Sequence, residues 1–233
     1  MSSFTEENYL KAIYKLSGEK QSAGQTPPFH GRAGQRHVLT NAIAGSLNTK
    51  ASSVTDMLKK LSDKKFIRYK KYRGVTLTRA GEKVALKIIR KHRLWELFLV
   101  EHLDFKWDEV HEIAEQLEHI IAPELVNRLD KYLKYPKYDP HGDPIPDKDG
   151  NIHNHKEVSL IDLNIKEPAI IVGVKDSSSL FLQYLENARL VPGTKISVIN
   201  RIDYDNSTVV SINGGKEVAI SAKVSKNLYV KKI

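Results

Sequence analysis

Histidine and glutamate side chains recur at helical spacing in two neighbouring stretches of the sequence. His92 and Glu96 are four residues apart, so on a helix both side chains project from one face. The second stretch carries a longer stripe, spaced at i, i+4, i+7 and i+8, which consists of His111, Glu115, Glu118 and His119. Imidazole and carboxylate ligands without sulfur suit a fairly hard divalent transition metal, Mn²⁺ or Fe²⁺, for which Zn²⁺ or Co²⁺ could substitute. The alternative is an amphipathic helix with ordinary solvated side chains, but two such stripes in one chain favour a metal site.

Apolar periodicity predicts the helices that would carry both stripes. It indicates a long helix over residues 79–102, with Thr78 as its N-cap, and further helices over about 108–121 and 123–135. Residues 136–156 form a connector punctuated by Pro and Gly. The stripe on the second helix borders its apolar face, where ligands can be held partly out of water.

The N-terminal third is strongly basic. Residues 1–90 carry 18 Lys and Arg against 6 Asp and Glu, whereas residues 91–156 carry 9 against 14. The basic part suits a polyanion, because neutralised phosphates release counterions, and the acidic part suits a cation. This asymmetry suggests two functions on one chain, although composition alone would also fit a simple solubility effect.

The order of elements in this basic third is that of a winged helix-turn-helix. Helices are expected over about 6–17, 40–47 and 51–64, and residues 67–78 have the alternation and tight turn of a hairpin. In that fold the last of these helices enters the major groove and the wing follows the backbone. We therefore predict contacts with double-stranded DNA from Lys50, Ser52, Ser53, Thr55, Asp56, Lys59, Lys70 and Arg73. The alternative is a winged helix with a solvated basic face that binds protein.

The C-terminal part changes to strand-like periodicity. Runs over 168–174, 195–200, 207–213 and 216–223 read as strands, with a short helix over 178–189. We expect a small, mostly β module of barrel type. The predicted fold is thus mainly α with β, in three domains spanning residues 1–78, 79–156 and 157–233.

Composition excludes several classes of protein. The chain has no cysteine, which rules out a disulfide scaffold, a thiolate zinc site and a cysteine nucleophile. It has no apolar run of membrane-spanning length and no N-terminal targeting pattern, so we expect a cytoplasmic protein that does not associate with membranes. Residues 18–37 are rich in Gly, Pro and Gln and read as a mobile loop, with His30 and His37 not expected to bind metal.

Five motifs together resemble the diphtheria toxin repressor family. They are residues 5–14 (TEENYLKAIY), 77–81 (LTRAG), 90–96 (RKHRLWE), 110–119 (VHEIAEQLEH) and 140–146 (PHGDPIP). The resemblance covers nearly the whole chain apart from residues 18–37. It is strongest to the manganese-responsive repressors that have a third, SH3-like domain, and it implies a homodimer formed through the central helices.

The resemblance also implies two metal positions in each subunit. The primary position falls on Asn8, Glu115, Glu118 and His119. The second falls on His92, Glu96, Asp139, His141 and Asp176, with His111 between the two as a weaker candidate. Asn8 stands where manganese sensors usually carry Asp, and Asp139 where some relatives carry Cys. Both still offer an oxygen ligand.

The function predicted from these observations is a metal-dependent DNA-binding repressor that senses Mn²⁺ or Fe²⁺ and controls metal-homeostasis genes. One alternative is a winged-helix regulator that responds to an organic ligand. A less favoured alternative is a metal-dependent nuclease or hydrolase, suggested by His153 and His155 in the polar connector.

Overall fold

The computed structural model describes residues 3–18, 37–70, 73–152 and 157–233. The chain divides into two compact units, one of residues 1–91 with 146–151 and one of residues 92–145 with 152–233. Among the described residues, no helix has both the length and the apolar character needed to cross a membrane. Residues 19–36, which hold most of the predicted loop, and residues 153–156 lie outside the described part, and with them His30, His153 and His155.

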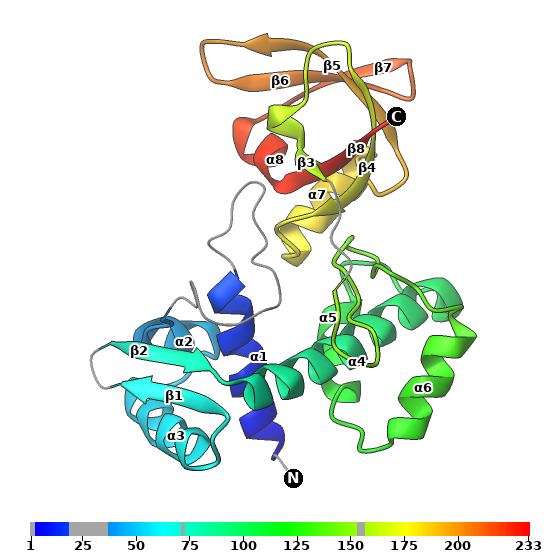
Figure 1. The fold of residues 1–233 in the computed structure, drawn as a ribbon. Coiled ribbons are helices and arrows are strands. Elements are labelled where there is room, and N and C mark those ends of the chain that lie inside the picture. The colour runs from blue at the N-terminus through cyan, green and yellow to red at the C-terminus, as the bar shows by residue number, and fades with distance from the viewer. Residues whose placement is uncertain (1–2, 19–36, 71–72, 153–156) are drawn as a thin grey trace. The chain divides into compact units, whose positions relative to one another are not determined.

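The first unit has the predicted helix-turn-helix with a wing (Figure 1). It contains α1 (Phe4–Gly18), α2 (Thr40–Ser46), α3 (Ala51–Asp63) and the hairpin of β1 (Ile67–Lys70) and β2 (Gly74–Leu77), followed by the first half of α4 (Arg79–Leu103). The hairpin is antiparallel, with Ile67 opposite Leu77. The core unites all of these elements through apolar side chains that include Leu10, Ile13, Ile43, Val54, Leu58, Leu61 and Val75.

The caps of two helices decide where they begin. Thr78 caps α4 as predicted, because its Oγ1 accepts a hydrogen bond from the Gly81 amide at 3.2 Å. Helix α1 begins at Phe4, two residues before the start expected from the sequence. Ser3 and Glu6 form a reciprocal pair at this end, in which each side chain accepts a hydrogen bond from the other residue's backbone amide.

The second unit begins with the second half of α4, followed by α5 (Val110–Leu117) and α6 (Pro123–Tyr132). The predicted second helix is therefore too long, because Glu118 and His119 lie in the turn after α5. Pro123 begins α6, and a proline keeps the residue before it, Ala122, out of the helical region. The core between α4 and α6 consists of Leu94, Leu97, Val126, Leu129, Leu133 and Ile145.

The remainder of this unit is a small β module. It contains β3 (Val158–Ser159), a short 3₁₀ helix (Leu160–Asp162), β4 (Pro168–Val174), α7 (Ser179–Ala188), β5 (Lys195–Ile202), β6 (Ser207–Ile212), β7 (Lys216–Ile220), α8 (Ala222–Asn227) and β8 (Leu228–Lys232). The strands form one antiparallel sheet in the order β3-β8-β4-β5-β6-β7. Sequence periodicity missed β3, α8 and β8, and it continued β7 to residue 223, where Ser221 instead caps α8 by accepting a hydrogen bond from the Val224 amide.

Candidate metal centre and nucleic-acid interface

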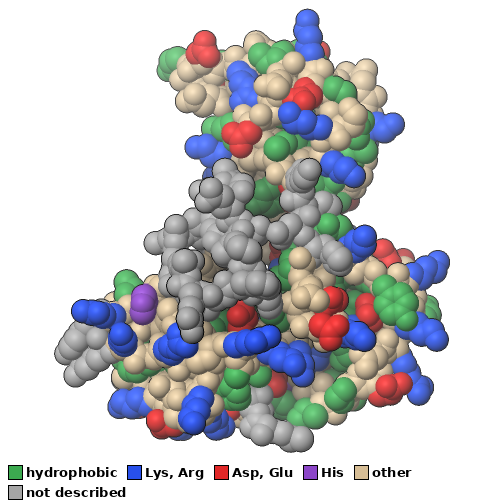
Figure 2. All heavy atoms as spheres, in the orientation of Figure 1, with side chains coloured by type: hydrophobic (Ala, Val, Ile, Leu, Met, Phe, Trp, Pro, Cys, Tyr) green, Lys and Arg blue, Asp and Glu red, His purple; other side chains and the backbone are tan. Residues whose placement is uncertain are grey.

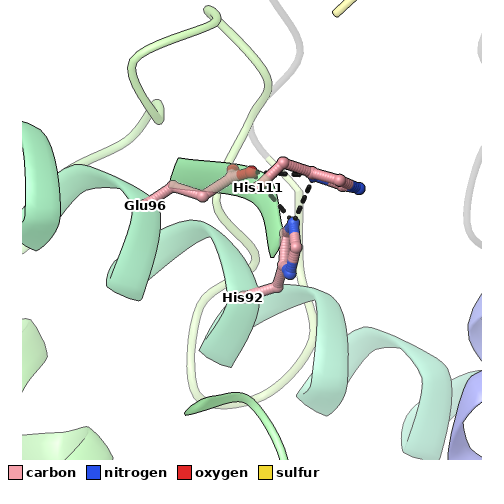
Figure 3. Close-up of side chains that lie close together, drawn as sticks. All are labelled: His92, Glu96 and His111. Carbon is pink, nitrogen blue, oxygen red and sulfur yellow. Dashed lines mark hydrogen bonds and ion pairs between the residues drawn. The ribbon is translucent and has the colours of Figure 1, made fainter. Parts of the chain in front are cut away.

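Three potential ligand atoms converge where α4 faces the start of α5 (Figure 3). Nε2 of His92 lies 2.9 Å from Oε1 of Glu96 and 3.1 Å from Nδ1 of His111, and that nitrogen lies 3.1 Å from the same carboxylate oxygen. His92 and Glu96 are buried, whereas His111 is 44% exposed. We call these residues the first ligand group. His111 therefore joins His92 and Glu96 directly, which the sequence had left as a weaker assignment.

Glu118 orients the His92 ring. Its Oε2 lies 2.6 Å from Nδ1 of His92, and only 1% of its side chain is exposed. A proton on Nδ1 shared with this carboxylate leaves Nε2 to face Glu96 and His111. Carboxylates that hold the outer nitrogen of a ligand histidine are a recurrent feature of metal sites. The same Glu118 carboxylate lies 3.7 Å from Nε2 of His119, so it touches both histidines.

A second ligand group shares Glu96. Ligand atoms of Glu96, Asp139 and His141 lie within 4.8 Å of one another, and all three residues are buried. The distance from Oε2 of Glu96 to Nδ1 of His141 is 3.7 Å. Nε2 of His141 lies 2.8 Å from the Trp107 carbonyl oxygen, to which it donates, so Nδ1 is the ring nitrogen turned toward Glu96. Oε1 of Glu96 therefore lies in the first ligand group, and Oε2 of the same carboxylate faces His141 of the second.

The turn that carries Asp139 and His141 is held against the β module. The His141 carbonyl accepts a hydrogen bond from the Val174 amide of β4 at 2.8 Å. Gly142 has a φ of +87°, and a Cβ at this position would lie 2.3 Å from the Val172 carbonyl oxygen. Only glycine fits such a close approach. The turn therefore packs closely against β4, and Asp139 and His141 lie beside that strand.

Burial and neighbouring side chains shift the pKa values of three residues in this centre. Burial raises the pKa of Glu96, but the rings of His111, His141 and His92 outweigh it and hold that pKa well below its usual value. Burial lowers the pKa of His141, yet the Glu96 carboxylate, with Asp139, raises it to about 9. Burial, with the charges of Asp143 and Glu96, raises the pKa of Asp139 to about 7. Such perturbed groups in one cluster are typical of functional sites.

The donor set fits a divalent transition metal. Imidazole nitrogens and carboxylate oxygens converge in both groups, without sulfur, as the preference of Mn²⁺, Fe²⁺ or Zn²⁺ requires. In the first group, the ring nitrogens of His92 and His111 and one carboxylate oxygen of Glu96 lie within 3.1 Å of one another.

The remaining predicted ligands are placed differently. Glu115 is half exposed, and its Oε1 lies 3.6 Å from Nε2 of His111. The Asp176 carboxylate accepts a hydrogen bond from the Ser178 amide, and Asp176 belongs to neither ligand group among the described residues. Asn8 is exposed on α1 in the other unit. The primary position, with Asn8, Glu115, Glu118 and His119, therefore stays a prediction, as does the ligand role of Asp176.

Sequence reasoning missed two residues of this centre, Arg93 and Trp107. Arg93 contacts Asp139 and Asp143, and Trp107 stacks on His141 with ring centroids 6.0 Å apart. The only signal in the sequence was the position of Arg93 beside His92.

The predicted DNA-contacting residues lie mostly on the surface of the first unit. Seven are exposed, namely Lys50, Ser52, Ser53, Asp56, Lys59, Lys70 and Arg73. Thr55 is half-buried and its hydroxyl donates to the Ala51 carbonyl, so it is the least available of the set. Asp56 pairs with Lys59 at 3.3 Å, which offsets the one acidic charge. Lys and Arg side chains are spread over this unit on the face shown in Figure 2.

The N-terminus of α3 is open to an anion. Among the described residues, no side chain caps this helix, whose N-cap is Lys50. Its first amides therefore remain available for a phosphate. A groove beside it is lined by Ala44, Gly45, Asn48, Thr49, Lys50 and Ser53.

Comparison with known proteins finds family models for the DNA-binding part, the metal-binding part and the β module. Three family models match: the iron dependent repressor N-terminal DNA binding domain over residues 32–75, its metal binding and dimerisation domain over 78–147, and the FeoA domain over 158–232. The iron-dependent repressor IdeR of Mycobacterium leprae is 28% identical, with 98% of this chain and 97% of that protein covered.

Solved structures of metal-dependent repressors are also similar to this chain over nearly its whole length. A manganese-dependent transcriptional repressor in complex with manganese is 28% identical with a TM-score of 0.82, covering 98% of this chain and all of that one. The structure of ScaR with bound Zn²⁺ is 32% identical with a TM-score of 0.73, covering 98% and 99% of the two chains. These matches confirm the resemblance drawn from the sequence motifs, and the chain belongs to the iron-dependent repressor family.

Proposed function

We propose that this protein is a metal-dependent transcriptional repressor that binds double-stranded DNA as a homodimer in response to Mn²⁺ or Fe²⁺. The convergence of His92, Glu96 and His111 in the second unit carries the proposal, since three potential ligand atoms lie within 3.1 Å of one another there. The exposed basic residues of α3 and the wing, in the other unit, supply the DNA-binding surface. The hydrolase alternative is not supported, because the family consists of DNA-binding repressors.

A bound divalent cation would neutralise the clustered carboxylates and hold its ligands in one arrangement. In the primary position that the family resemblance implies, the ligands would come from both units. Asn8 belongs to α1, and Glu115, Glu118 and His119 belong to α5 and the turn after it. By tying α1 to the ligands after α5, metal would favour one placement of the winged helix. Metal favours DNA binding only through its higher affinity for that placement, so DNA must tighten metal binding by the same factor.

A homodimer would place two copies of α3 on successive half-sites about one DNA turn apart, or a multiple of one turn. The second unit offers a surface for such pairing around the α5–α6 turn and α6. Large apolar side chains are exposed there, among them Ile121 at 73% and Tyr135 at 65%, with Ile120, Leu125 and Tyr132. Exposed apolar patches of this kind mark interaction surfaces.

The ligand types fit Mn²⁺ and Fe²⁺ equally well. All of the proposed ligands carry oxygen or imidazole nitrogen, which both ions accept, and Zn²⁺ or Co²⁺ would serve as surrogates. We propose that the metal-bound dimer represses genes of metal homeostasis.

The test is DNA selection from a pool of random duplexes by the full chain, with Mn²⁺ or with a chelator. We expect enriched sequences with two related half-sites in Mn²⁺ and none in chelator. Equal enrichment in chelator would favour a regulator of organic-ligand type, and cleavage of the recovered duplexes would favour a nuclease. As a control, His92→Ala should remove the response to Mn²⁺ while salt-dependent, non-specific DNA binding persists.

A further inference from the structure

One guanidinium holds the turn that carries Asp139 and His141. Nη1 of Arg93 donates to the Pro144 carbonyl oxygen at 2.5 Å, and Nη2 donates to Oδ2 of Asp143 at 2.9 Å. Nε of the same side chain lies 3.5 Å from Oδ2 of Asp139. Arg93 stands on α4, directly after His92 and three residues before Glu96. Only 14% of the Arg93 side chain and 1% of the Asp139 side chain are exposed, whereas Asp143 is 52% exposed.

The Asp139 carboxylate has one oxygen left for a metal. Oδ1 accepts hydrogen bonds from the backbone amides of His141 and Asp143, both at 2.9 Å. Oδ2 is the atom that faces Arg93. A carboxylate oxygen has two lone pairs, so Oδ2 can contact the guanidinium and still turn a lone pair toward Glu96 and His141.

We propose that Arg93 is a positioning residue, which fixes the turn of residues 139–144 on α4 and thereby presents Asp139 and His141 to a metal shared with Glu96. This inference rests on the proposed function, because it concerns the second ligand group. The planar fork of arginine suits the task, since it donates in several fixed directions at once. A lysine would keep the charge but would lose the simultaneous contacts to the Pro144 carbonyl and Asp143.

The positive charge of Arg93 by itself would act in the opposite direction. A cation beside Asp139 repels a metal, so loss of that charge alone would tighten metal binding. Asp143, paired with the guanidinium, already offsets much of this repulsion. A positioning role predicts weaker binding without Arg93, and the sign of the change therefore separates the two roles.

The test is calorimetric titration of the full chain with Mn²⁺. Arg93→Gln should weaken the binding event that His141→Ala weakens, by about 10- to 100-fold, as is usual for residues that orient ligands. The event weakened by His111→Ala should not change. Arg93→Lys should be intermediate. Arg128→Gln is the matched control, because Arg128 is 77% exposed on α6 and pairs only with Glu124 in the described contacts.

A second measurement needs no metal. Amide hydrogen exchange of the metal-free chain should become faster in Arg93→Gln at His141, Asp143 and Ile145, whereas α6 should be unaffected. Unchanged exchange in this turn, tighter or unchanged Mn²⁺ binding, or full rescue by Arg93→Lys would each overturn the inference. If His141→Ala alters no Mn²⁺ binding event in the parent chain, the second ligand group is refuted instead, and the exchange result still decides whether Arg93 holds the turn.

Discussion

Metal binding to the second ligand group should be strongly pH-dependent, because its histidine carries a proton at neutral pH. The Glu96 carboxylate, with Asp139, raises the pKa of the buried His141 to about 9 against the effect of burial. A metal must displace that proton from Nδ1. At pH 7, two units below this pKa, the displacement costs about 2.7 kcal/mol, or roughly 100-fold in apparent affinity. Asp139, with a pKa raised to about 7, adds a second proton at lower pH.

The expected result is an apparent Mn²⁺ affinity that rises about tenfold per pH unit between pH 7 and pH 9, and more steeply below pH 7. Calorimetry in buffers of different ionisation enthalpy counts the protons released. About one should leave per metal at pH 8. His141→Gln should weaken binding and remove the proton release in this range, whereas His111→Ala should keep it.

The free energy of unfolding of the metal-free chain should fall as pH rises, whereas the apparent metal affinity should rise. His141 has a folded pKa above its unfolded value of 6.5, so its contribution is complete below pH 6.5 and is lost as pH rises through about 9. Asp139 acts in the same sense, since its folded pKa of about 7 also exceeds its unfolded value. Denaturant midpoints should therefore fall from pH 6 to pH 9 without metal. Metal affinity independent of pH, with no proton release between pH 7 and pH 9, would refute this reasoning.

Three other substitutions test separate parts of the molecule. Lys70→Glu should weaken DNA binding and lower the slope of log affinity against log salt by about one, with Mn²⁺ affinity in calorimetry unchanged; loss of metal binding by the folded variant would contradict the division into two functions. Asn8→Asp should shift metal-dependent DNA binding to lower Mn²⁺ concentration, because a carboxylate adds negative charge to the primary position; an unaltered titration would show that Asn8 is only a surface residue of α1. Glu6→Gln should cost about 1 kcal/mol at pH 7, since Glu6 pairs with the partly exposed Lys64 at 2.7 Å. Burial raises the pKa of Glu6, but Lys64 and the Ser3 amide outweigh it, so this contribution is present above the unfolded pKa and is lost as pH falls through the lowered folded value. Urea denaturation of both proteins at pH 7 and pH 3 should show the difference at pH 7 alone.

The helical spacing of His92 and Glu96, and of the stripe that starts at His111, was readable from the sequence because ligands on one helix are local neighbours. The winged-helix order was readable for the same reason, since caps, turns and apolar periodicity act over a few residues. The end of α5 could not be predicted from the sequence. The turn at Glu118 depends on the contact of its carboxylate with His92, which lies on another helix.

The sequence by itself determined the chemistry of the centre: imidazole and carboxylate, without sulfur, beside a basic DNA-binding part. The tertiary structure decided which side chains share a site. His111 joins His92 and Glu96 across two helices, Glu96 serves two groups with its two oxygens, and Arg93 reaches residues fifty positions away. Such pairings depend on the packing of separate elements, and spacing along the chain carries no information about distances between elements that only the packed core brings together.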